Sequence, residues 1–213
     1  MIITYLGKQF FKIQQGDMVI AMNPISKDSK SGAKVSRFGA DIVFSTTNHP
    51  DYNGVETVTY GEKEPFAITG PGDYEVKDVF VRGLISDAEI SGKKYINTIY
   101  SFTIDGINIC FLGALSNEKL LAEAREAIGN VDVLFVPIGG EGMVDAHIAY
   151  KVATSLEPGI IIPMDYGDDQ KKDALKIFLK EGGEEKSDPQ EKLTLKKKDL
   201  DGKDGDIVVL KFT

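Results

Sequence analysis

Two side chains with metal-binding chemistry lie two residues apart in one polar segment of the chain. His49 and Asp51 flank Pro50 in the segment 45–53, which reads STTNHPDYN. Imidazole and carboxylate groups are common ligands of zinc and related divalent ions. The same two groups also organise turns by hydrogen bonding to nearby backbone, and for an isolated pair this structural role carries more weight. The pair predicts either a turn or the remainder of a metal site.

The segment resembles a motif of the metallo-β-lactamase superfamily. In that family a strand leads into a loop with the signature His-x-His-x-Asp-His, and here the strand-like run 41–44 precedes the segment. His49 and Asp51 match the signature, whereas Thr47 and Tyr52 stand where the family has histidine. A hydroxyl and a phenol are poor metal ligands at neutral pH. The resemblance implies the fold of that superfamily with a metal site that has lost ligands.

Further blocks extend the resemblance from residue 1 to about residue 166. They are similar to the compact metal-dependent hydrolases related to L-ascorbate-phosphate lactonases, and the block 70–76, GPGDYEV, resembles a turn typical of this branch that is quite specific in combination. At other matching positions the chain departs from the family pattern. Ala114 stands at the position of a metal-bridging aspartate, and Asp165 at that of a histidine on the last ligand strand. Lys8 stands where a histidine commonly follows the glycine of the opening strand, and Asn23 where the family has the aspartate of an Asp-Pro turn.

The resemblance implies that these positions meet in one candidate pocket. Its expected residues are Lys8, Asn23, Thr47, His49, Asp51, Tyr52, Asp73, Ala114, Asp165 and Tyr166. Metal ligands act together, so losing several removes most of the affinity and also the metal-activated water that serves the family as nucleophile. We therefore expect no metal cofactor and a non-catalytic binding or interaction protein. Lys8 is expected to pair with Asp165 or Asp51, against the alternative of a solvated loop lysine.

Two other functions stay open. The first is a metal-dependent hydrolase that holds one zinc or other divalent ion on His49, Asp51 and Asp165. The second is an accessory subunit of a nucleic-acid-processing complex, by analogy with other members of the superfamily. The net charge of -8 counts against direct contact with nucleic acid, because phosphate binding needs a basic face. The expected partner is an unidentified protein or small-molecule ligand, and a homo-oligomer is also open.

The rest of the sequence bears on other catalytic motifs and on the cellular compartment. Patterns such as G-x-S-x-G, the Walker loop and the dinucleotide fingerprint do not occur. Cys110 is the only cysteine and lies inside an apolar run, which is typical of a small buried hydrophobe. A lone cysteine is compatible with a reducing cytoplasm, the run 1–6 reads as a strand, and no apolar run approaches membrane-spanning length. We expect a cytoplasmic protein that does not enter membranes.

The elements that must position these residues change character along the chain. The first half predicts strands at 2–6, 10–13, 18–22, 42–44, 57–60, 66–68, 79–82, 98–104 and 107–112. The second half predicts a helix from Ser116 to Gly129, one capped by Asp145, and one over 170–181, with strands at 131–136 and 160–162. A final pair of strands is expected at 192–196 and 207–212, around the turn-rich segment 201–205.

Strands followed by helix–strand units predict layered packing. With the resemblance, the expected fold class is α/β (α+β), and the expected architecture is a four-layer αββα sandwich in a single domain spanning 1–213. The expected core residues are Ile2, Val43, Ile109, Leu134 and Ile161.

Overall fold

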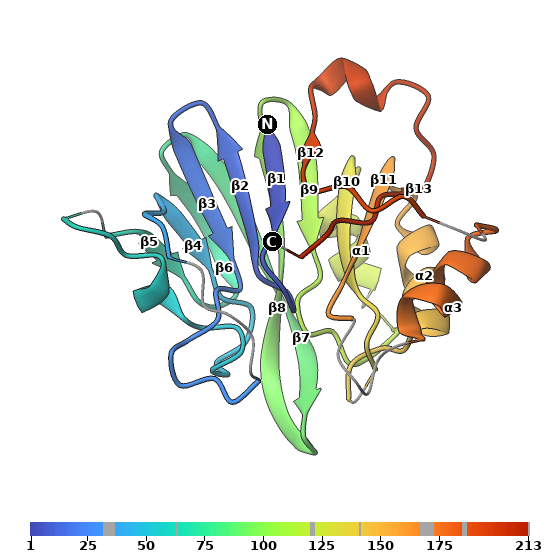
Figure 1. Cartoon of the computed structure of the whole chain (residues 1–213), viewed down its shortest axis with the longest axis horizontal. Helices are drawn as coiled ribbons and strands as arrows, with labels where there is room; N and C mark the ends of the chain where they lie inside the picture. Colours follow the sequence, from blue (N-terminus) through green and yellow to red (C-terminus); the bar gives the residue numbers. More distant parts are fainter. Residues whose placement is uncertain are drawn as a thin grey trace.

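Two β-sheets lie face to face, and helices cover the outer face of one of them (Figure 1). The computed structural model describes residues 1–31, 37–62, 64–119, 122–140, 142–166, 173–184 and 187–212. The first sheet has the order β12 (Leu193–Thr194), β1 (Ile2–Tyr5), β2 (Phe11–Gln15), β3 (Met18–Met22), β4 (Ile42–Phe44) and β5 (Phe66–Ile68). The second has the order β13 (Asp206–Ile207), β11 (Ile160–Met164), β10 (Val133–Pro137), β9 (Ile107–Phe111), β8 (Lys93–Ile104), β7 (Val79–Ile90) and β6 (Gly72–Val76).

The helices follow from capping and from an apolar face. The α-helices of the described residues are α1 (Ala122–Ile128), α2 (Ala146–Ser155) and α3 (Ala174–Glu181). Asp145 caps α2 as predicted, since its side chain accepts a hydrogen bond of 2.9 Å from the backbone N–H of Ile148. No helix in the described part of the chain is long and apolar enough to cross a membrane.

Apolar side chains fill the space on both faces of the second sheet. Between the sheets, the rings of Phe11, Phe111 and Phe135 contact one another, with centroids 4.8 to 6.4 Å apart. Under the helices a second core contains Leu134 and Ile161. The central strands β10 and β11 are buried along their whole length because both of their faces are covered. This confirms the expected sandwich of two sheets, with helices over the outer face of the second.

The layer over the first sheet differs from the expected helix. Among the described residues this face is covered by the irregular segments between β3 and β5, which include the short 3-10 helix η1 (Val55–Thr57). Ile25, Ala40 and Val58 from these segments pack on Val43. The strand predicted at 57–60 is wrong. Val58 is buried, but it follows η1 in an irregular segment and is not part of a strand.

Two further predictions are corrected, and part of a third lies outside the described residues. The expected helix start at Ser116 is wrong, because residues 112–119 are not helical and the Ser116 hydroxyl donates to the backbone carbonyl of Asp87 at 2.9 Å. The start of the predicted helix 170–181 at residues 170–172 lies outside the described residues. The two last strands do not pair with each other, since β12 joins β1 and β13 joins β11.

Four of the five predicted core residues are fully or almost fully buried, and Ile2 is the exception. Successive side chains of a strand point to opposite faces, and in β1 the buried face is that of Ile3 and Tyr5. Ile2 is therefore only partly buried.

The outermost strands of both sheets are short or charged. β5 has three residues and follows Pro65, whose nitrogen has no hydrogen to donate. β6 exposes Asp73 and Glu75. β12 and β13 have two residues each. These are the features by which proteins make sheet edges unattractive to other strands.

Candidate functional site

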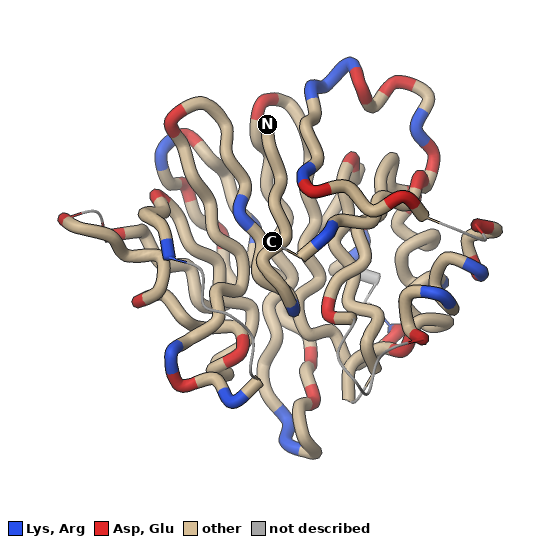
Figure 2. The backbone as a smooth tube through the Cα atoms, in the orientation of Figure 1, with Lys and Arg blue, Asp and Glu red and all other residues tan. Residues whose placement is uncertain are grey.

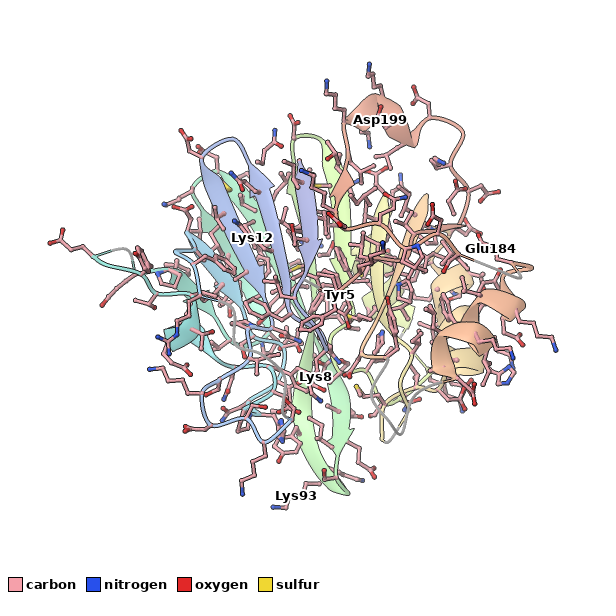
Figure 3. All side chains as sticks on the ribbon, viewed as in Figure 1. Tyr5, Lys8, Lys12, Lys93, Glu184 and Asp199 are labelled. Atoms are coloured by element: carbon pink, nitrogen blue, oxygen red, sulfur yellow. The ribbon has the colours of Figure 1, made fainter. Side chains whose placement is uncertain are left out.

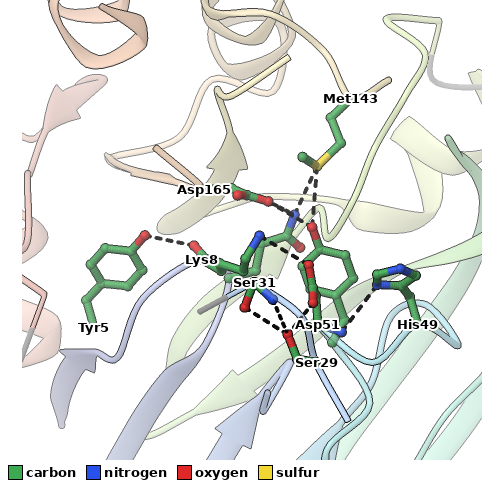
Figure 4. A network of polar contacts seen from close by, with 10 residues as sticks. Tyr5, Lys8, Ser29, Ser31, His49, Asp51, Met143 and Asp165 are labelled. Atoms are coloured by element: carbon green, nitrogen blue, oxygen red, sulfur yellow. Dashed lines mark hydrogen bonds and ion pairs between the residues drawn. The ribbon is translucent and has the colours of Figure 1, made fainter. Parts of the chain in front are cut away.

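The candidate site lies where several strands end and the chain turns sharply. Lys8 follows β1, Asn23 follows β3, Thr47 lies in the loop after β4, and Asp165 follows β11. Lys8, Asn23 and Asp165 have φ angles of 50°, 46° and 60°. Residues other than glycine rarely adopt this left-handed backbone conformation, and where they do it often marks a functional site. The turns bring several of the expected residues together (Figure 4).

Tyr52 and Asp165 are in direct contact at the centre of the site. The Tyr52 hydroxyl donates a hydrogen bond of 2.9 Å to Oδ2 of Asp165, and both side chains are almost completely buried. Burial, followed by the negative charge and the hydrogen bond of Asp165, raises the pKa of Tyr52 well above its usual value. Tyr52 is therefore a neutral donor at neutral pH and not an oxygen anion available to a metal.

Gln9 supplies the second donor to Asp165 and was missed by sequence reasoning. Its amide nitrogen lies 3.0 Å from Asp165 Oδ2 and 3.2 Å from the sulfur of Met143, and its amide oxygen accepts from Asn23 at 2.9 Å. Met143, from the loop between β10 and α2, was missed as well. Gln9 is distinguished by its complete burial, and burial is not visible in a sequence.

Asp51 is held by a lysine and a serine. Oδ2 of Asp51 lies 3.1 Å from the ammonium nitrogen of Lys8, and the two side chains are 13% and 19% exposed. The Ser29 hydroxyl donates a short hydrogen bond to the other carboxylate oxygen. The partner of Lys8 is thus Asp51, the second of the two expected partners. The backbone N–H of Asp165 donates to the Lys8 carbonyl oxygen at 2.7 Å.

His49 is oriented by its own loop. The ring nitrogen Nδ1 accepts the backbone N–H of Asp51 at 3.2 Å. A neutral imidazole has one accepting and one protonated nitrogen, so the proton lies on Nε2 in this arrangement. His49 therefore has no free lone pair to offer a metal unless the bond to Asp51 breaks. The ring also lies edge-on to Tyr95, with centroids 5.6 Å apart.

The positions of Thr47 and Ala114 are joined by Asn97 of β8. The amide oxygen of Asn97 accepts from the Thr47 hydroxyl at 3.2 Å and from the Ala114 backbone N–H at 2.9 Å. Gly113 precedes Ala114, and a Cβ atom on Gly113 would lie 2.5 Å from the same amide oxygen. Only glycine therefore allows the Asn97 side chain to lie this close to the backbone. Asn97 thus connects the loops after β4 and β9, a role that the sequence alone did not suggest.

Two expected residues face away from this centre. Asp73 is exposed on the edge strand β6 and pairs with Arg82 at 3.0 Å, so its assignment to the pocket is corrected. The Tyr166 hydroxyl donates to the carbonyl of Leu210 at 3.1 Å, and burial raises its pKa to about 12. Tyr166 therefore anchors the C-terminal segment beside the site.

The donor set does not fit a metal ion of the kind that the family resemblance implies. In the described part of the chain, no three His, Cys, Asp or Glu side chains gather closely enough to hold a metal. Asp51 is neutralised by Lys8, His49 accepts a backbone hydrogen, and Asp165 accepts from Gln9 and Tyr52. Each group that remains from a ligand set already has a protein partner.

Comparison with known proteins agrees with the fold and shows what the chain is similar to. Residues 2–165 match the family described as the β-lactamase superfamily domain. A UPF0173 metal-dependent hydrolase of Thermococcus kodakarensis is 23% identical over 192 residues, which cover 77% of this chain and 84% of that protein. A protein of the same description from Lysinibacillus sphaericus is 23% identical over 198 residues, with the same coverage of both chains.

A solved structure extends the likeness over almost the whole chain. The crystal structure of a Thermotoga maritima protein, assigned as a Zn-dependent hydrolase of the metallo-β-lactamase superfamily, superimposes with a TM-score of 0.77. The two chains are 27% identical, and the match covers 98% of this chain and 97% of the other. The fold class predicted from the sequence is confirmed, and the Thermococcus kodakarensis and Lysinibacillus sphaericus proteins are both described as metal-dependent hydrolases.

Proposed function

The chain belongs to the β-lactamase superfamily, and from that premise we propose that it is a member whose metal centre has been replaced by a protein-only binding site. The observation that carries the proposal is the hydrogen bond of 2.9 Å between Tyr52 and Asp165. Both side chains stand at positions where the resemblance expects metal-binding histidines, and here they bind each other. The ion pair of Lys8 with Asp51 supports the same reading, because an ammonium group supplies a positive charge beside the carboxylate.

The proposed protein acts by binding, without a chemical step. A hydrolase of this type needs an activated water, and the side chains at this site are already engaged with each other. Lys8, Asp51 and His49 are partly exposed and form the accessible part of the site. They offer an ammonium, a carboxylate and an imidazole N–H to a ligand, which favours a small polar molecule or a polar segment of a protein.

A metal-dependent hydrolase is the second candidate, and the names of the relatives favour it more directly than the first proposal. Two relatives are called metal-dependent hydrolases, and the Thermotoga maritima protein is assigned as Zn-dependent. In this alternative His49, Asp51 and Asp165 hold a single ion. That arrangement requires Lys8 to leave Asp51 and the His49 ring to release the Asp51 backbone N–H.

An accessory role in nucleic-acid processing receives no added support from the site. Acidic and basic residues are interspersed over the chain in Figure 2, and the net charge is -8. A binding groove for phosphate backbones would need a basic stripe.

Elemental analysis of protein expressed with added zinc and purified without chelator tests the proposal. We expect well under one equivalent of zinc, manganese or iron. A triple variant, Thr47→His/Tyr52→His/Asp165→His, serves as the positive control, because it restores imidazole at three positions of the family pattern. Near-stoichiometric metal in the wild type, lost on His49→Ala, would favour the hydrolase instead. Turnover of lactone, phosphodiester or thioester substrates that stops with chelator and with Asp51→Ala would establish it.

A further inference from the structure

The C-terminal segment 208–212 crosses from the second sheet to the first (Figure 1). On the second sheet, the backbone N–H of Val208 donates to the carbonyl of Ile161 in β11 at 2.9 Å. On the first sheet, Phe212 forms an isolated parallel bridge with Tyr5 at the end of β1. The segment 208–212 is called the strap below. The match to the superfamily ends at residue 165, so the strap lies outside the matched part of the chain.

Hydrogen bonds and burial fix the path of the strap. The Tyr166 hydroxyl donates to the Leu210 carbonyl at 3.1 Å. The backbone N–H of Gln190 donates to the Val209 carbonyl at 2.9 Å, and the Gln190 carbonyl accepts from the Lys211 N–H at 2.7 Å. Val209 and Leu210 are buried. These contacts determine where the strap brings its last described residue, Phe212.

The ring of Phe212 lies directly on the backbone of Gly7. A Cβ atom on Gly7 would lie 2.8 Å from Cε2 and 3.0 Å from Cδ2 of that ring, which is too close for normal packing. Gly7 also has a φ angle of 98°, which side chains other than that of glycine rarely allow. Phe212 is 51% exposed, so one part of its ring covers Gly7 while the other part faces solvent.

Gly7 immediately precedes Lys8, whose side chain reaches the candidate site. Lys8 has a left-handed φ angle of 50°, a conformation that persists only where the surroundings hold it. The Lys8 carbonyl accepts from the Tyr5 hydroxyl at 2.8 Å (Figure 4) and from the Asp165 backbone N–H at 2.7 Å. Tyr5 and Lys8 lie near each other at the end of β1 (Figure 3). These hydrogen bonds hold the Lys8 carbonyl, and the Phe212 ring packs on the residue before it.

We propose that Phe212 is a positioning residue that keeps the ammonium group of Lys8 on the carboxylate of Asp51. With the ring in place, the turn at Gly7 is confined, and the Lys8 side chain stays 3.1 Å from Asp51. Without the ring, Gly7 regains the conformational freedom of an open glycine turn, and the ion pair separates more often. The importance of this for ligand binding rests on the proposed function, in which Lys8 offers its ammonium group to the ligand.

Acetylation by acetic anhydride, followed by peptide mass spectrometry, tests the proposal, because the Lys8 amine must leave Asp51 before it can react. We expect Phe212→Ala to raise the acetylation rate of Lys8 about fivefold or more relative to that of Lys12 on β2. Phe212→Tyr keeps the ring and should react like the wild type. Phe66→Ala is the matched control, because Phe66 is also 51% exposed but lies on β5.

Three results would overturn the proposal. The first is an equal effect of Phe212→Ala and Phe66→Ala on the ratio of the two acetylation rates. The second is a parallel rise at Lys8 and Lys12, which would report general loosening of the fold. The third is a Phe212→Tyr variant that reacts like Phe212→Ala.

A second substitution tests the route by which Phe212 acts. Asp51→Asn removes the charge of the carboxylate and should by itself raise the acetylation rate of Lys8. In that background Phe212→Ala should add little, because the ion pair that the ring protects is already lost. An equally large effect of Phe212→Ala in both backgrounds would refute the positioning role. All rates are measured with chelator present, so the result does not depend on the metal analysis that tests the proposed function.

Discussion

The phenol of Tyr52 and the carboxylate of Asp165 are joined by a hydrogen bond of 2.9 Å across 113 residues of sequence. One side chain comes from the loop after β4 in the first sheet and the other from the end of β11 in the second. The bond therefore ties the two sheets together at their shared rim. A metal ion bound by ligands from both sheets would also connect the sheets at this rim. The stability of the rim is therefore a direct test of the proposed metal-free site.

Replacing Tyr52 by phenylalanine should destabilise the protein by about 1–3 kcal/mol, because Asp165 loses a donor while it remains buried. Urea unfolding measures the effect. Tyr60→Phe is the control, since Tyr60 is 71% exposed and its variant should unfold like the wild type. Equal stability of Tyr52→Phe and the wild type would show that the bond does not support the fold.

Replacing Lys8 by methionine should destabilise the protein by about 1–2 kcal/mol, because Asp51 keeps its charge in a partly buried position. Methionine retains most of the apolar stem, so the loss reports mainly the ammonium group. Adding Asp51→Asn in the Lys8→Met background should recover part of the loss. The double-mutant cycle gives the coupling energy of the pair, and purely additive effects would mean that Lys8 and Asp51 do not act as one unit.

Removing divalent ions with a chelator should leave the melting temperature of the wild type unchanged. An ion present at a hundred times its dissociation constant would add about 2.7 kcal/mol to the folded state, so a bound metal could not escape detection. Differential scanning calorimetry with and without chelator makes the measurement. A fall in melting temperature that is reversed by zinc would establish a structural metal and contradict the proposed site.

Stability should fall with rising pH from about pH 9 upward. Burial raises the pKa of Cys110 from 9.0 to about 12, and the pKa of Tyr52 is also raised well above 10.0. Above the unfolded pKa the unfolded chain releases protons that the folded chain retains, so unfolding becomes progressively more favourable. Denaturant midpoints between pH 8 and pH 11 measure the slope. Tyr52→Phe should make the slope shallower above pH 10, and an unchanged slope would exclude Tyr52 as a contributor.

Ile161→Ala should lower the free energy of unfolding by about 2–5 kcal/mol, because the side chain is fully buried between the second sheet and the helices that cover it. Ile2→Ala is the matched comparison and should cost clearly less, since Ile2 is only partly buried. Equal losses of stability in equilibrium unfolding would show that the burial of these two side chains does not determine the cost of removing them.

The fold could be predicted because it leaves local signals and a family resemblance. Apolar runs predicted most strands, and the polar cap Asp145 placed α2. Strand lengths could not be predicted in the same way. In the outer part of β7 and β8 the isoleucines Ile85 and Ile96 are exposed, so apolar residues there do not mark a buried face and the strands carry no clear alternating pattern.

The site was predicted in position better than in composition. The motif around His49 located the loop, and Lys8, Tyr52 and Asp165 do meet there. Gln9, Asn97 and Met143 were missed, because their importance depends on which distant residues they reach and not on neighbours in sequence. Asp73 was misplaced because the turn pattern around it predicts where the chain bends and does not predict whether the Asp73 side chain points toward the site.

The short or charged outermost strands affect how the protein should behave at high concentration. With β5 preceded by Pro65, β6 carrying Asp73 and Glu75, and β12 and β13 only two residues long, the described sheet ends offer little backbone for a foreign strand to extend. The chain should therefore resist growth into fibrils even when crowded. Any polymerisation on storage should start from partial unfolding that frees a central strand such as β10.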